Sequence, residues 1–248
     1  MVGLTGRTDF GRASWPDVEA AVGRGAVAVL AIGAAEQHGA HLPLSTDTIL
    51  AHGVAGRIAD ALEGILLPPI TYGDAWNNEA FTGTISLSPD TLRAVITDIG
   101  HGVLRMGVKV LVIVNGHFGN REPIALAARR LDGDGLRVMY LDYPRMEVLA
   151  GHVCESKPAA PGFYHADEVE TSMMLVFAPD TVDMGRAEPE YPDFPETFGM
   201  EPMQLRQFNV TGVFGDPRPA SAEKGEALIA GIVEESVRLI RLFAERHG

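Results

Sequence analysis

The sequence contains a single cysteine, Cys154, among 248 residues. One cysteine cannot form an internal disulfide, and a metal site built from several thiolates is excluded as well. Basic residues are also few, because 20 Lys and Arg stand against 33 Asp and Glu and leave a formal net charge of −13. This deficit argues against nucleic-acid binding, which needs a basic patch or stripe, and against docking on anionic lipid.

Long apolar runs are absent too. No stretch approaches the roughly 20 apolar residues that a membrane-spanning helix needs. The first 14 residues, MVGLTGRTDFGRAS, lack the apolar core of a secretion signal. We therefore expect a cytoplasmic protein without membrane contacts.

Short apolar runs alternate along the chain with segments whose apolar residues recur at helical spacing. This pattern predicts strands at 25–33, 65–72, 109–117 and 136–143, and helices at 48–62, 88–107, 120–131 and 225–246. Strands that alternate with helices pair in parallel through right-handed crossovers. We predict an α/β fold, with a single domain over residues 1–248 and a mainly parallel sheet flanked by helices.

From about residue 187 to 219 the composition changes, since Pro, Glu, Phe and Met dominate and no periodicity is left. An irregular segment of this length in a compact domain is usually a functional lid or a disordered excursion. Its apolar residues would also suit a contact between subunits. The sequence does not decide between a lid and a subunit interface for this segment.

Side chains of the kind that bind metals follow two of the predicted strands. Glu36 and His38 come just after the first strand, and residues two apart in an extended chain point to the same side. Asp47 begins the next helix, whose free N–H groups favour a carboxylate, and His117 ends the third strand. Because ligands bind at the carboxyl ends of the strands in an open parallel sheet, we expect these four side chains to meet.

Imidazole and carboxylate groups without thiolates suit Zn, Mn or Fe. Asp47 has two carboxylate oxygens and can bridge two ions. A bridged pair can generate hydroxide at neutral pH and polarise a carbonyl group at the same time. Spacing alone also allows the four side chains to be hydrogen-bonded polar groups that hold no metal.

Five segments, taken together, resemble the creatininase (creatinine amidohydrolase) family. They are GAAEQHGAHLPLSTD (33–47), FTGTISLSPDTL (81–92), NGHFGN (115–120), HADEVETSMM (165–174) and GVFGDPRPASAEKGE (212–226). The resemblance runs from about residue 25 to 230 and implies a creatininase-like fold. Known members of the family are metal-dependent hydrolases of non-peptide or unusual amide bonds.

The resemblance implies two divalent ions per chain, Zn, Mn or Fe. Glu36, Asp47 and His117 would hold one ion, and His38 together with the shared Asp47 would hold the other. Creatininase has a further glutamate ligand at the position that is Gly119 here.

Glu168 or Glu170 is expected to replace that missing ligand. We favour Glu168, which we place one helical turn from His165, and we count it as both a metal ligand and a catalytic residue. His165 matches the family's histidine beside the reacting group, a proton shuttle to the leaving nitrogen.

Trp76, Phe118, Phe163 and Tyr164 are the expected substrate-binding residues. Tyr164 stands where creatininase has an acidic residue, and Asn77-Asn78 replaces a Glu-His pair of the family. These departures argue against creatinine as the substrate.

The sequence thus predicts a metal-dependent amidohydrolase that uses metal-activated hydroxide on a cyclic amide, a formamide or a peptide-like C–N bond. The alternative is a binding or scaffold protein that keeps the fold without catalysis. A small-molecule amide is the expected partner, and the family resemblance favours a homo-oligomer, most of all a hexamer.

Overall fold

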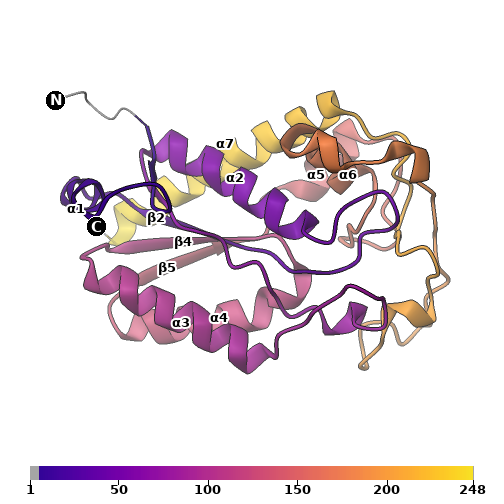
Figure 1. Cartoon of the computed structure of the whole chain (residues 1–248), viewed down its shortest axis with the longest axis horizontal. Coiled ribbons are helices and arrows are strands. Elements are labelled where there is room, and N and C mark those ends of the chain that lie inside the picture. Colours follow the sequence, from indigo (N-terminus) through magenta and orange to yellow (C-terminus); the bar gives the residue numbers. More distant parts are fainter. Residues whose placement is uncertain (1–5, 248) are drawn as a thin grey trace.

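A computed structural model describes residues 6–247, and a parallel β-sheet lies at its centre (Figure 1). Within these residues the strands are β1 (Thr8–Asp9), β2 (Ala28–Ile32), β3 (Ile65–Leu66), β4 (Val110–Asn115) and β5 (Arg137–Leu141). They lie in the order β1-β3-β2-β4-β5, and each neighbouring pair is parallel. The predicted α/β fold is confirmed. The predicted domain also includes residues 1–5 and Gly248, which lie outside the described residues.

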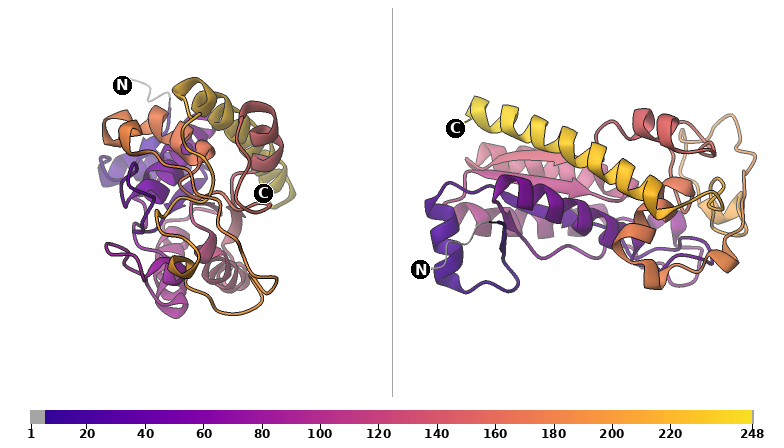
Figure 2. Two further views of the ribbon diagram at one scale, coloured as in Figure 1. Left: turned by 90° about the vertical axis from the view of Figure 1, so that its right-hand side faces the viewer. Right: turned by 90° about the horizontal axis from the view of Figure 1, so that it is seen from above.

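Helices cover both faces of this sheet, as Figures 1 and 2 show. The helices are α1 (Trp15–Gly23), α2 (Thr46–Leu62), α3 (Pro89–Arg105), α4 (Arg121–Gly133), α5 (Met146–Val153), α6 (Glu168–Phe177) and α7 (Ala222–His247). One apolar core lies between the sheet and α2, α6 and α7, and a second core lies between the sheet and α3 and α4.

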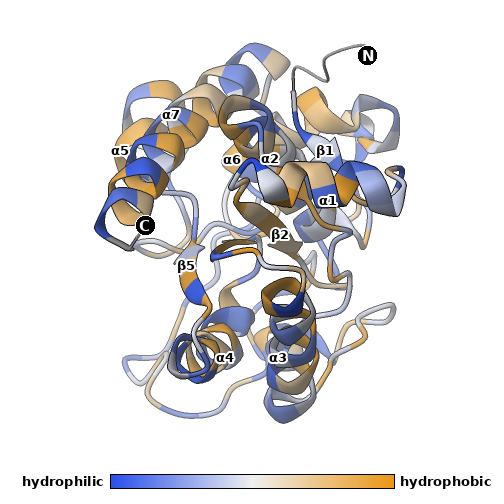
Figure 3. Ribbon diagram, turned by 90° about the vertical axis from the view of Figure 1, so that its left-hand side faces the viewer, coloured by the Kyte–Doolittle hydropathy of each residue, from blue (hydrophilic) through white to orange (hydrophobic). Residues whose placement is uncertain are grey.

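Alternate residues of one strand enter these two cores. Val29 of β2 packs in the core with α2, whereas Ala28 and Leu30 pack in the core with α3 and α4. Every residue of β2 and β4 is buried, which explains why these strands are continuous apolar runs in the sequence. Figure 3 shows the apolar β2 between the two helical layers.

The predicted strand at 65–72 is shorter in the structure, where β3 ends at Leu66. Two prolines, Pro68 and Pro69, follow and have no N–H group to donate to a neighbouring strand. The chain rejoins the sheet only at Ile70, which forms an isolated bridge with Ile32.

Three helices were not predicted from the sequence, namely α1, α5 and α6. The side chain of Asp167 caps α6 by accepting hydrogen bonds from the N–H groups of Val169 and Glu170. His165 therefore lies outside this helix. The expectation that Glu168 stands one helical turn from His165 is corrected accordingly.

Segment 187–219 lies over the end of the molecule that faces right in Figure 1 and forward in the left view of Figure 2. It contains one short 3₁₀ helix, Leu205–Gln207, and an isolated bridge between Glu190 and Gly215. Asn77 donates a hydrogen bond to the carbonyl oxygen of Met203 and so ties the segment to the loop before α3.

The connections of the sheet mark one position as a ligand site. The chain leaves β2 through α2 toward β3, and after β3 it crosses to the other side of β2 and forms β4. The carboxyl ends of β2 and β4 therefore flank a topological switch point, where open α/β sheets bind ligands. No helix among residues 6–247 combines the length and apolar character needed to cross a lipid bilayer.

Candidate metal centre

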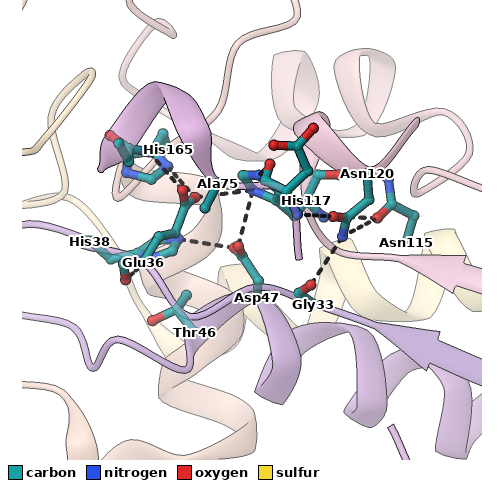
Figure 4. A network of polar contacts seen from close by, with 12 residues as sticks. Gly33, Glu36, His38, Thr46, Asp47, Ala75, Asn115, His117, Asn120 and His165 are labelled. Atoms are coloured by element: carbon teal, nitrogen blue, oxygen red, sulfur yellow. Dashed lines mark hydrogen bonds and ion pairs between the residues drawn. The ribbon is translucent and has the colours of Figure 1, made fainter. Parts of the chain in front are cut away.

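Asp47 lies in the first turn of α2, close to the carboxyl ends of β2 and β4 (Figure 4). Gly116, which follows β4, permits this close approach, because a Cβ atom there would lie 2.5 Å from the carbonyl oxygen of Asp47. The N–H groups at the start of α2 favour the carboxylate. The local packing therefore places a buried acid between two strand ends.

His117 turns one ring nitrogen toward this acid. Its Nε2 donates a hydrogen bond to the carbonyl oxygen of Asp74 at 2.8 Å. Its Nδ1 lies 3.1 Å from Oε1 of Glu36 and 3.2 Å from Oδ2 of Asp47. A carbonyl oxygen can only accept, so this bond fixes the proton on Nε2 and leaves Nδ1 facing two carboxylates.

His38 repeats this arrangement on the other side of Asp47. Its Nδ1 donates to the carbonyl oxygen of Glu36 at 3.1 Å. Its Nε2 lies 3.0 Å from Oδ1 of Asp47 and 3.6 Å from Oε2 of Glu170. The two imidazoles thus face the two oxygens of one carboxylate.

The carboxylates hold positive charge on both imidazoles. Burial would lower the pKa of His38, but Asp47 and Glu170 outweigh it and raise the pKa to about 10. The pKa of His117 is also well above its ordinary value, because Glu36 and Asp47 outweigh its burial. Burial would raise the pKa of Asp47, but His38 and His117 keep that pKa well below its ordinary value. The site requires cations, which protons or metal ions can supply.

Several observations fit divalent metal ions. Oδ2 of Asp47 is buried, and the contact that the structure gives it is the ion pair with Nδ1 of His117 at 3.2 Å. Metal-binding histidines commonly donate their other N–H to a backbone carbonyl, as His38 and His117 do. Potential ligand atoms lie within 4.8 Å of one another in three groups: Glu36–Asp47–His117, His38–Asp47–Glu170 and Glu36–His38–His165. Asp47 belongs to two of these groups, as a bridging carboxylate would.

Glu168, which we expected in this centre, points elsewhere. Its carboxylate accepts hydrogen bonds from the N–H groups of Glu155 and Ser156, and Nζ of Lys224 lies 2.5 Å from it. Glu170 instead reaches the centre, beside His38. The preference for Glu168 over Glu170 is therefore reversed.

The structure also explains why Gly119 bears no ligand. A Cβ atom at Gly119 would lie 2.0 Å from the carbonyl oxygen of Asp74, the oxygen that fixes the tautomer of His117. No side chain fits there unless that carbonyl moves. A carboxylate from α6 has no such conflict.

His165 stacks on His38, with ring centroids 4.4 Å apart. The amide nitrogen of Gln37 donates to its Nε2 at 2.8 Å, so that its proton sits on Nδ1, 3.6 Å from Oε1 of Glu36. Burial and the charge of His38 lower the pKa of His165 to about 4. His165 is therefore a neutral imidazole beside two charged ones.

Two buried residues next to the centre, Gln37 and Asn78, were missed. Asn78 donates to Oε2 of Glu36 at 2.7 Å, and the amide of Gln37 lies 3.2 Å from the side-chain oxygen of Asn78. The position of Gln37 between Glu36 and His38 was the only signal for it. Asn78 was noted only as a departure from the family, and the structure places it against a candidate ligand.

The two asparagines of NGHFGN hold His117 in place (Figure 4). Asn115 accepts from the N–H group of His117 at 3.2 Å and donates to its carbonyl oxygen at 2.8 Å. Asn120 accepts from the N–H group of Asp74 at 2.9 Å. The motif thus positions both His117 and the carbonyl that fixes its tautomer.

A cavity of about 520 Å³ opens beside this centre, and His117 and Glu170 are in its wall. Phe118, Phe163 and Tyr164, three of the expected substrate-binding residues, line it as well. Trp76 lies apart from this wall. Its side chain is 41% exposed, and its carbonyl oxygen accepts a hydrogen bond from Gln204.

Segment 187–219 meets the cavity wall through phenylalanines. The rings of Phe194 and Phe198 stack 4.0 Å apart, and each lies 6.3 Å from the ring of Phe163. Phe163 in turn lies 6.4 Å from His165. The segment therefore packs against Phe163, which lines the cavity.

Comparison with known proteins gives matches over nearly the whole chain. The family model "Creatininase: Creatinine amidohydrolase" matches residues 11–240. The chain is 29% identical over 247 residues to the creatinine amidohydrolase of Pseudomonas putida, and this match covers 93% of this chain and 95% of that protein. It is 31% identical over 246 residues to the mycofactocin precursor peptide peptidase of Mycobacterium ulcerans, with 92% and 85% covered.

Solved structures agree with these matches. A mutant creatininase described as "Zn-Zn type" superposes with a TM-score of 0.83 at 29% identity, over 95% of this chain and 97% of that one. A structure described as "Creatininase Mn" superposes with a TM-score of 0.81 at 29% identity, over 95% and 98%. The likeness therefore includes both the sequence and the fold.

Proposed function

The chain belongs to the creatininase family, and on this premise we propose that it is a metal-dependent amidohydrolase. Its substrate is a cyclic amide, a formamide or a peptide-like amide whose C–N bond is cleaved. The relatives named above are hydrolases of carbon–nitrogen bonds. One observation supports the proposal most: Nε2 of His38 and Nδ1 of His117 face the two oxygens of buried Asp47 at 3.0 and 3.2 Å.

We assign Glu36, Asp47 and His117 to one divalent ion, and His38, Asp47 and Glu170 to the other. The set of nitrogen and oxygen donors suits Zn, Mn or Fe. Such ions, when bound, polarise a carbonyl oxygen and lower the pKa of a water molecule.

His165 is the residue that moves the proton. A neutral imidazole can take a proton at one nitrogen and give it up to a leaving amine nitrogen. Gln37 holds the ring by donating to Nε2, and the stacking on His38 keeps it beside the ligands. His165 is thus placed to serve the reaction without being needed to hold a metal.

The cavity supports a small substrate. Apolar walls from Phe118, Phe163 and Tyr164 stand next to the polar centre, which is the usual composition of a small-molecule site. Trp76 is left out of the proposed site. Segment 187–219 acts as a lid through its contact with Phe163, or it serves as a subunit interface.

The experiment pairs metal content with amide turnover. The protein is stripped with a chelator, reloaded with Zn or Mn, and analysed for metal per chain. Stripped and reloaded samples are then assayed on cyclic ureides, formamides and short peptides. Turnover that disappears with the metal and returns on reloading is the expected result.

Asp47→Asn provides the test variant, and Asp60→Asn provides a matched control on the same helix, because Asp60 is a surface residue paired with Arg7. The first variant should lose both metal and turnover, and the second should keep both. A wild-type protein that binds two ions but hydrolyses none of these amides would instead favour the binding or scaffold alternative.

A further inference from the structure

The cavity has a wall that the proposed function does not use. β5 ends at Leu141, and the next residues, Asp142 and Tyr143, line the cavity together with His117 and Glu170. β5 pairs with β4, so its carboxyl end lies beside the strand end that presents His117. This edge of the sheet is where open α/β folds bind their ligands.

The hydroxyl of Tyr143 has no partner there. Its oxygen is buried and makes no hydrogen bond to any of the described residues. Burying a hydroxyl without a hydrogen bond is unfavourable, and native proteins rarely leave such a group unsatisfied. The unpaired hydroxyl therefore indicates that a bound ligand supplies its hydrogen-bond partner.

The backbone around this residue is strained as well. Tyr143 has φ +41°, and Arg145 has φ +65°. Left-handed conformations are costly for residues with a Cβ atom, and they cluster at ligand sites, where the strain holds a side chain in a required place. Both residues line the cavity.

The surroundings keep the hydroxyl protonated. Burial raises the pKa of Tyr143 well above its ordinary value, and the negative charges of Asp47 and Asp142 raise it further. A protonated phenol donates a hydrogen bond. Tyr143 therefore has an unused donor, and it lines the same cavity as His117 and Glu170.

We propose that Tyr143 is a further catalytic residue, whose hydroxyl donates a hydrogen bond to the carbonyl oxygen of the amide as that oxygen gains negative charge. The proposal rests on the proposed function and adds a donor on the β5 side of the cavity. Fixed donors aimed at a developing oxyanion are among the strongest contributions to catalysis of acyl transfer.

The test uses Tyr143→Phe, which removes only the hydroxyl. Tyr140→Phe is the matched control, because Tyr140 lies three residues earlier on β5 and is 50% exposed. Each metal-loaded protein is analysed for metal content, for the affinity of inorganic phosphate by calorimetry, and for kcat and KM on any amide that the wild type cleaves. Phosphate serves as a tetrahedral oxyanion whose binding needs no turnover.

Tyr143→Phe should keep the wild-type metal content and should melt no lower than the wild type, since it removes an unpaired buried group. Its phosphate affinity should fall about tenfold or more, and kcat should fall by roughly 10²-fold with little change in KM. Tyr140→Phe should match the wild type in all of these.

Phosphate affinity and kcat within twofold of the wild type would overturn the proposal, as would loss of metal from Tyr143→Phe or a wild type that binds no phosphate. If the wild type cleaves no amide but phosphate binding depends on Tyr143, the proposed function fails and the oxyanion site stands.

Discussion

Glu170→Gln offers the sharpest test of how the second ion is held. Glutamine keeps the size of the side chain and removes the charge, so it isolates the carboxylate from the packing. Oε2 of Glu170 lies 3.6 Å from Nε2 of His38 and accepts a hydrogen bond from the N–H group of Ala166 at 2.6 Å. If this carboxylate is a ligand, the variant should bind one ion at full affinity and lose most of the other.

The pKa values of Glu170 and His38 determine how many protons the second ion displaces when it binds. Burial and the charges of Asp47 and Asp167 raise the pKa of Glu170 to about 8, so this carboxyl takes up a proton more readily at pH 7 than an ordinary glutamate does. The pKa of His38 is about 10. Metal ligands must be deprotonated, so the second ion displaces up to about one proton from Glu170 and about one from His38. In Glu170→Gln only the proton of His38 is left to release.

Calorimetry measures this release directly. Zn or Mn is titrated at pH 7 in two buffers with different enthalpies of ionisation, and the difference in heat gives the number of protons released. Glu168→Gln is the matched control, because it makes the same chemical change two residues away, where the carboxylate pairs with Lys224. The control should keep both ions and the wild-type proton release.

Two results would refute the reasoning. If Glu170→Gln binds both ions with wild-type affinity and proton release, another group is the ligand. If Glu168→Gln is the variant that loses an ion, the original preference for Glu168 is right.

Four further predictions follow from the same geometry. Asp47→Ala should abolish turnover and lower the metal content by more than one site, whereas His38→Ala should lose mainly one ion; near-wild-type turnover in the Asp47 variant would contradict the bridge. His165→Ala should keep both ions while kcat falls by roughly 10²–10⁴-fold, and metal loss in that variant would make His165 a ligand. The metal-free protein should lose stability in urea as the pH rises from 6.5 through about 10, because the pKa of His38 is raised over that range on folding; a flat profile there would contradict the ion pair with Asp47. Replacing Phe194, Phe198 and Phe208 by Ala should raise KM or change the substrate preference at constant metal content, with light scattering to follow the expected hexamer; if only the assembly dissociates, segment 187–219 is an interface and not a lid.

Local patterns were sufficient for β2 to β5 and for the residues at the strand ends, but not for the two-residue strand β1. β2 and β4 are buried on both faces, so their sequences are apolar runs. Glu36, His38 and His117 lie in the loops that follow these strands. Parallel pairing then brings those ends together whatever the details of the helices. Each predicted strand was longer than the observed one. The difference is largest for β3, because the apolar residues beyond Pro69 return to the sheet at a single bridge.

The choice between Glu168 and Glu170 depended on where α6 begins. Asp167 and Glu170 stand three residues apart, as in a capping box, a spacing that marks a helix N-terminus. Read that way, the sequence would have placed the start of α6 after Asp167 and turned Glu170 back toward the residues before it, where it accepts from Ala166. This signal was present and was not used.

Gln37, Asn78 and Tyr143 had no comparable signal. Gln37 contacts His165, 128 positions away, and Asn78 contacts Glu36 across 42 positions. Such contacts are set by how loops pack over the sheet edge, and no local spacing encodes that packing. The side chains that orient the ligands are therefore harder to infer than the ligands.

Packing also excludes a side chain at Gly119. The carbonyl of Asp74 passes 2.0 Å from the place of a Cβ atom at this position, and that carbonyl fixes the tautomer of His117. In this backbone the centre can keep either a side chain at 119 or the bond between Asp74 and His117. Glu170 brings a carboxylate to His38 without that conflict, because it comes from α6, which packs against α2 and α7. The proposed ligand set therefore draws on two strand ends and two helices, and the position of Glu170 depends on the packing of α6 rather than on the motif around His117.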